Sequence, residues 1–198
     1  MYIFFFIMMY LASSLSNAFL FTVPPFDENS KLNDTCETEL KHIFQTNKHN
    51  NEGIDFSSFK YLLLNFKHLH KYNDNEIERL FTNEVEINGL MDEKQFLKQV
   101  INVVKRIETT IENFYKAFLI HNKMTITELI SALMFVDCQI TNERAIQLIN
   151  IEKTDPQNIS REAFRNIYAK LYNEYLHERQ DTETLMKSFP LYESLDPR

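Results

Sequence analysis

The chain has 198 residues, 44% of them hydrophobic, a length and composition that suit one compact unit or two small lobes. Its formal net charge of −7 argues against nucleic-acid binding, which requires a basic face, and favours basic protein partners instead. Only two glycines are present, so a glycine-rich phosphate-binding loop is excluded.

The first segment of the chain is predicted to be a targeting sequence. Residues 1–23 contain no charged side chain and open on a dense apolar run. The small residues Ser-Asn-Ala at 16–18 match a signal-peptidase site, which predicts cleavage before Phe19. Residues 1–18 are therefore expected to be a signal peptide. A membrane anchor is the alternative, because the uncharged segment is long enough to span a bilayer uncleaved, and no other membrane contact is expected.

After a linker expected at residues 19–34, the chain carries amphipathic segments with helix-start signals. Three pairs of residues have the spacing of a capping box. They are Asp34 with Glu37, Asn73 with Glu76, and Asp92 with Gln95. Apolar stripes with helical periodicity follow these pairs, and no long alternating run indicates a sheet. The predicted fold class is therefore all-α.

The middle of the chain is predicted to form one long helix. Residues 97–118 contain neither glycine nor proline, and they continue the helix expected to open at Asp92. Such a helix would connect two lobes. The alternative is a break near residues 108–110.

One apolar pattern occurs four times. In each copy, an apolar residue is followed by a second after ten positions and by a third after five more. The copies are Phe44, Ile54, Phe59; Phe81, Met91, Phe96; Phe114, Met124, Leu129; and Ile149, Ile159, Phe164. They recur every 33 to 37 residues, a period that indicates an internal repeat.

This spacing fits two helices around a twelve-residue loop and resembles the EF-hand family, in which a calcium loop joins two helices. The resemblance covers residues 35–175. It implies four helix–loop–helix units in two pairs, as in calmodulin, troponin C and myosin light chains. The loops are then 47–58, 84–95, 117–128 and 152–163. In that family the residue at loop position 8, here the middle residue of each copy, makes a short β-contact with the paired loop.

The resemblance also sets the expected domains. The first pair of units is assigned to residues 35–103 and the second pair to residues 104–175. Residues 176–198 are then a tail, which either frays or docks on a lobe.

Loop two is the only candidate metal site. An EF-hand loop binds calcium through positions 1, 3, 5, 7, 9 and 12, with a bidentate Glu at position 12. In loop two these positions are Glu84, Glu86, Asn88, Leu90 through its carbonyl, Asp92 and Gln95. Gly89 stands at position 6, where the family turns sharply. Because Gln95 replaces the bidentate Glu, weak calcium binding at best is predicted. The alternative is a structural loop whose acidic groups face water.

The other three loops lack more ligands. Loop one has one carboxylate at a ligand position, Asp55, and ends on Ser58. Loop three keeps Glu128 at position 12, but its positions 1 and 3 are apolar. Loop four has Pro156 and Ala163 at positions 5 and 12. By resemblance to myosin light chains, such units keep their fold through packing rather than through metal.

Further features bear on the compartment. Cys36 and Cys138 would form a disulfide or remain two partly buried thiols. Asn33 and Asn158 begin glycosylation sequons, and Asn158, in a predicted loop, is expected to be the more constrained. No ER-retrieval signal ends the chain. Secretion or a later secretory compartment is expected, with a membrane-anchored or cytoplasmic protein as the alternative.

No catalytic constellation is present, so an enzyme is not expected. His68 and His70 point to different faces of a helix, and Cys36 has no histidine base beyond His42. The resemblance implies a calmodulin-like protein whose hydrophobic grooves bind an amphipathic partner helix. Its methionines at 91, 124 and 134 would either line such grooves or fill the core. The alternatives are a calcium sensor or buffer of the secretory pathway that uses loop two, and a cytosolic myosin-light-chain-like subunit.

Overall fold

The computed structural model describes residues 19–49, 52–135 and 138–188, with side chains described up to residue 176. Within these residues the secondary structure is helical, with only isolated β-bridges, so the all-α prediction is confirmed. The helices are α2 (Asp34–Asn47), α3 (Phe56–Leu64), α4 (Lys67–His70), α5 (Asp74–Thr82), α6 (Glu93–Ala117), α7 (Ile126–Phe135), α8 (Asn142–Ile151) and α9 (Arg161–Ser188). In the described part of the chain, no helix has the length and apolarity needed to cross a membrane.

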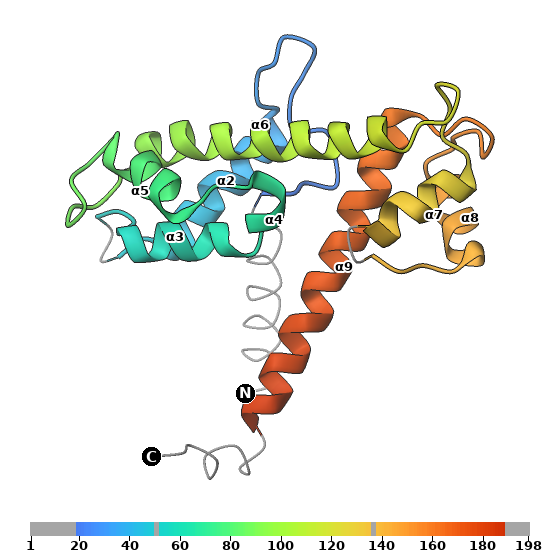
Figure 1. Ribbon diagram of the computed structural model, residues 1–198. Helices are drawn as coiled ribbons and strands as arrows, with labels where there is room; N and C mark the ends of the chain where they lie inside the picture. The colour runs from blue at the N-terminus through green and yellow to red at the C-terminus, as the bar shows by residue number, and fades with distance from the viewer. Residues whose placement is uncertain (1–18, 50–51, 136–137, 189–198) are drawn as a thin grey trace.

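Helix α6 organises the molecule (Figure 1). It packs against α2 and α4, and α3 packs against α5 beside them. We call these elements the first half. At the other end of α6, α7 packs against α8, and α9 packs against both α6 and α8. We call the end of α6 with α7, α8 and α9 the second half. From there α9 descends obliquely away from α6 in the view of Figure 1.

The helix starts follow from local capping, with one correction. The capping boxes of Asn73 with Glu76 and of Asp92 with Gln95 are both present. Helix α2, however, is capped by Asn33, whose Oδ1 accepts from the Cys36 N–H at 2.8 Å. The predicted cap at Asp34 is wrong by one residue, because Asn33 takes the extended cap conformation.

Helix α6 is continuous, and the alternative of a break near residues 108–110 is wrong. Nothing in its sequence breaks a helix, and it crosses the expected domain boundary after residue 103. Helix α9 likewise continues through residue 175 into the expected tail.

All but one of the repeated apolar residues lie in the core. In the first, second and fourth copies all three residues are buried, and in the third copy Met124 and Leu129 are buried as well. Phe114 is the exception, because its ring is only half-buried. At roughly 25 cal/mol per Å² of apolar surface, this burial is the main term that stabilises the fold.

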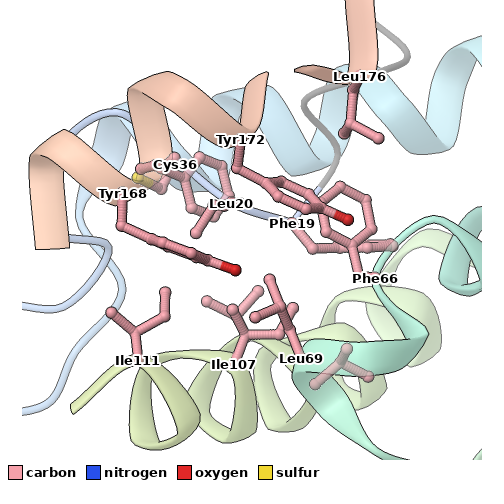
Figure 2. Close-up of a cluster of buried hydrophobic side chains, with 14 of the residues drawn as sticks. Phe19, Leu20, Cys36, Phe66, Leu69, Ile107, Ile111, Tyr168, Tyr172 and Leu176 are labelled. Carbon is pink, nitrogen blue, oxygen red and sulfur yellow. The ribbon is translucent and has the colours of Figure 1, made fainter. Parts of the chain in front are cut away.

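The start of the described chain belongs to the core rather than to a free linker (Figure 2). Phe19 and Leu20 are completely buried and Phe21 is 2% exposed. The ring of Phe19 meets Phe66 edge-on, with 5.5 Å between centroids. Tyr172 of α9 contacts the same Phe66 at 5.9 Å, so this cluster joins α9 to the first half.

Both cysteines are buried and neither forms a disulfide, and burial raises the pKa of the Cys36 thiol to about 11. Of the two sequon asparagines, Asn33 rather than Asn158 is the more constrained, the reverse of the prediction. Asn33 uses its side chain twice, as the α2 cap and as a donor to the Pro24 carbonyl at 2.6 Å, whereas Asn158 is exposed.

Candidate functional site

The loops pair through their eighth positions. Ile54 and Met91 form an antiparallel bridge in which each N–H donates to the other's carbonyl, at 3.0 and 2.9 Å. In the second half the Ile159 N–H donates to the Met124 carbonyl at 2.7 Å. All four side chains are completely buried. Each loop is therefore fixed to its neighbour by backbone hydrogen bonds.

In loop two, the first predicted ligand already has partners. The Glu84 carboxylate is 9% exposed and lies 2.7 Å from the Lys98 Nζ. The Gln99 amide donates a very short hydrogen bond to the same carboxylate. These donors, Lys98 above all, hold the pKa of Glu84 below its usual value. The carboxylate that calcium would need as a ligand is thus paired with an ammonium group from α6.

The remaining predicted ligands of loop two cap α6, face water or are half-buried. Asp92 Oδ1 accepts from the Gln95 N–H at 2.8 Å, and Gln95 Oε1 accepts from the Asp92 N–H at 2.9 Å, which caps α6. Glu86 and Asn88 are exposed, and Leu90 is half-buried. Among the residues that the structure describes, no group of three or more acidic, histidine or cysteine side chains is arranged to hold a metal. Calcium binding in loop two stays a prediction.

Internal donors occupy the acceptors of the other loops in the same way. In loop one, His49 Nε2 lies 3.1 Å from Ser58 Oγ and 3.2 Å from Asp55 Oδ2, so positions 3, 9 and 12 meet at the imidazole. In loop three, Glu128 accepts from the N–H and the hydroxyl of Thr125. In loop four, the Asn166 amide donates to Glu152 at 2.9 Å. Donors of this chain therefore bind the acceptor groups of these three loops.

The chain turns at Gly89, whose N–H donates to the Glu86 carbonyl at 2.8 Å, but without the left-handed backbone that favours glycine. Neither glycine has a positive φ, whereas His121 and Asn122 of loop three have φ values of 50° and 61°. Asn122 stands at position 6 of that loop and suits the left-handed region better than most residues. Gly89 has a steric role instead, because a Cβ there would lie 2.5 Å from Val85 Cγ2.

A cluster of apolar side chains is exposed where α6 ends beside α7. Phe135 is 70% exposed and Met134 is 56% exposed. The Phe135 ring lies 5.8 Å from Phe118 and 6.3 Å from Phe114, centroid to centroid. We call these four residues the α6–α7 cluster. Among the methionines at 91, 124 and 134, only Met134 is exposed, since the other two fill the core.

Sequence reasoning singled out Phe114 and Met134 but not Phe118 and Phe135. A signal was present, because Leu129 and Leu133 already form the buried stripe of α7. The apolar residues directly after Leu133 therefore continue onto another face of the helix, where burial is not expected.

Other polar groups serve the fold. Both ring nitrogens of His70 are bound, Nε2 at 3.0 Å from the Leu63 carbonyl and Nδ1 as acceptor of the Tyr72 N–H at 2.9 Å. Burial lowers the pKa of this ring. A cavity of about 610 Å³ lies between residues 24–28, α6 and α9. The Arg165 guanidinium on its wall pairs with Glu108 at 2.7 Å, a structural ion pair.

No family model matches the chain, and no curated protein or solved structure matches it either. The proposals below therefore rest on the residues and their geometry.

Proposed function

We propose that the chain is a non-enzymatic, EF-hand-like interaction protein, built from four helix–loop–helix units in two pairs. Its second half binds an amphipathic partner helix through the α6–α7 cluster. The observation that carries the proposal is the exposure of Phe135 and Met134, at 70% and 56%, beside two further aromatic rings. Contiguous exposed apolar side chains mark interaction surfaces, and aromatic and methionine residues are enriched in them.

The paired loops support a scaffold that holds its shape without metal. Backbone hydrogen bonds join position 8 of each loop to its neighbour, as the family resemblance implies. Side-chain donors from this chain, such as Lys98 and Asn166, occupy acceptors that a cation would otherwise bind. Partner binding is therefore expected to be independent of calcium.

In the first half, the apolar side chains that face α9 are covered. Phe66 and Leu69 are completely buried there, under Phe19 and the aromatic residues of α9. An incoming helix would have to displace these groups and expose them to water. The aromatic cluster that is accessible to a partner helix is thus the one in the second half.

The charge of the chain favours a basic partner. With a formal net charge of −7, the protein attracts cationic segments at long range. A helix that inserts into an apolar groove is recognised by anchors at i, i+3, i+4 and i+7. The expected occupant is a helix with apolar residues at these positions and lysine on its other faces.

The test is a titration of such a synthetic helix into protein with ¹³C-labelled methionine methyl groups. The Met134 methyl resonance is expected to shift, while those of Met91 and Met124, both completely buried, stay in place. Phe135→Ser is expected to weaken binding by at least about tenfold, as for a central aromatic anchor.

Tyr61→Ser is the matched control, because Tyr61 of the first half is also 70% exposed. Equal weakening by both substitutions would contradict the proposal. So would a shift confined to the buried methionines, or affinity that appears only when calcium is added.

A further inference from the structure

The first residues of the described chain are packed as core residues. Phe19 and Leu20 have no exposed surface, and they lie among Tyr168 and Tyr172 of α9, Ile107 of α6 and Leu69 of α4 (Figure 2). The sequence predicts signal-peptidase cleavage directly before Phe19. The residue that cleavage would place first is therefore also a residue buried inside the protein.

Two polar atoms on α9 near this segment lack a hydrogen-bond partner among the described residues. Asn173 is 6% exposed, and its Nδ2 donates to the Leu20 carbonyl at 3.3 Å. This bond places the Asn173 carboxamide against the backbone of the segment, yet its Oδ1 accepts no hydrogen bond. The completely buried Tyr168 hydroxyl is also unpaired. A buried polar atom without a partner costs about 1–3 kcal/mol.

We propose that the mature chain begins at Phe19 and that its new amino group is held inside the protein by Asn173 Oδ1. A peptidase of the secretory pathway hydrolyses the Ala18–Phe19 bond. Water supplies the hydroxyl that leaves Ala18 as a carboxylic acid and the proton that leaves Phe19 with an amino group. A peptide nitrogen has one N–H to donate, whereas an amino group has at least two. Cleavage thus supplies an additional donor one residue before Leu20, whose carbonyl Asn173 already contacts.

The arrangement argues against cleavage after Phe19. Removal of Phe19 would take away the ring that meets Phe66 at 5.5 Å and open a space beside Tyr172. Loss of a buried phenylalanine is among the most destabilising changes that a core undergoes. Cleavage before Phe19 retains this ring and adds the donor. Processing therefore completes the core that joins α9 to the first half.

The test begins with the full-length chain expressed in a secretory eukaryotic host. Intact mass and amino-terminal sequencing are expected to show a product that starts at Phe19. An amine-acylating reagent is then applied to the folded protein and to the protein in urea. The amino group of Phe19 is expected to react at least about tenfold more slowly in the folded protein, because reaction requires local opening.

Variants assign the protection to Asn173. Asn173→Leu removes the acceptor and is expected to restore most of the reactivity, whereas Asn173→Asp keeps an oxygen acceptor and retains the protection. Asn150→Leu, at an exposed position of α8, is the control and changes nothing. The two buried thiols, Cys36 and Cys138, report on the fold, since they stay unreactive in any variant that is still folded.

Three outcomes would overturn the proposal. The first is a secreted product that starts elsewhere or retains residues 1–18. The second is an amino group that is acylated as fast in the folded protein as in urea. The third is protection that persists in a folded Asn173→Leu variant.

Discussion

The two halves of the molecule share one apolar repeat but cover it differently. In the first half, Phe66 and Leu69 are completely buried because Phe19 and α9 close over them. In the second half, Phe135 at the end of α7 stays 70% exposed. The cover is supplied by Phe19, which precedes the repeat, and by α9, the last helix of the repeat. Which half leaves its aromatic side chains exposed is thus decided by Phe19 and α9 rather than by the repeated spacing alone.

The largest expected effect comes from a comparison of two phenylalanine substitutions. Phe66→Ala is expected to lower the free energy of unfolding by about 3–5 kcal/mol, because the ring is completely buried between two aromatic neighbours. Phe135→Ala is expected to change it by less than about 0.5 kcal/mol, as for other exposed positions. Urea unfolding of both variants measures the difference. Similar losses would show that the second half is closed as well.

The second comparison concerns the two glycines. A Cβ at position 53 would lie 2.6 Å from the Met91 carbonyl oxygen, which belongs to the backbone of the paired loop. Gly53→Ala must therefore push the loops apart, and a cost of about 1–3 kcal/mol is expected. Gly89→Ala meets a Val85 methyl group most closely, with the Glu86 carbonyl oxygen farther away at 3.1 Å, and the methyl group has more freedom to move than a paired backbone, so a smaller loss is expected. Thermal unfolding of both variants measures the two losses of stability. A larger loss of stability for Gly89→Ala would refute this account of loop pairing.

The sequence alone predicts the parts of the fold that depend on local periodicity. The 10-plus-5 spacing places Ile54 and Met91 at the centres of loops, and the structure joins them by two hydrogen bonds. Capping-box spacing finds the starts of α5 and α6. These features are predictable because each depends on residues a few positions apart.

Tertiary partners are not predictable in this way. Nothing periodic in residues 19–21 indicates that they dock beside α9, more than 140 positions away in sequence. The ligand pattern of loop two likewise does not show that Lys98, three residues beyond the loop, turns back onto Glu84. In both cases the contact is made by a side chain that lies outside the local sequence motif.

A smaller effect is expected on the pH dependence of stability, through one acidic residue in each half. The pKa of Glu84 is lowered mainly by Lys98, and that of Glu128 mainly by Thr125. Both contributions to stability are present above the usual pKa of 4.5 and are lost as the pH falls through the lowered value. Glu84→Gln and Glu128→Gln are each expected to reduce the acid dependence of Tm by about one or two degrees.

Salt distinguishes the two groups. High ionic strength is expected to weaken the contribution of Glu84, whose partner is charged, and to leave that of Glu128 unchanged, because its donor is neutral. Melting curves at low and high salt give the comparison. Equal salt sensitivity would mean that Lys98 does not hold Glu84 in solution.

The smallest expected effect is calcium binding in loop two, where the ion must compete with this same lysine. Lys98→Met keeps most of the aliphatic stem and removes the ammonium group 2.7 Å from Glu84. Calcium affinity is expected to rise by about fivefold at most, because an ion pair with an exposed partner contributes about 0–1 kcal/mol. Calorimetry measures this rise, with magnesium as the competing ion and Lys94→Met, an exposed position of the same helix, as the control. Glu84→Gln should abolish the heat of binding in the Lys98→Met background. If neither the native chain nor Lys98→Met gives saturable heat, the calcium prediction is wrong, and the loops act through packing alone.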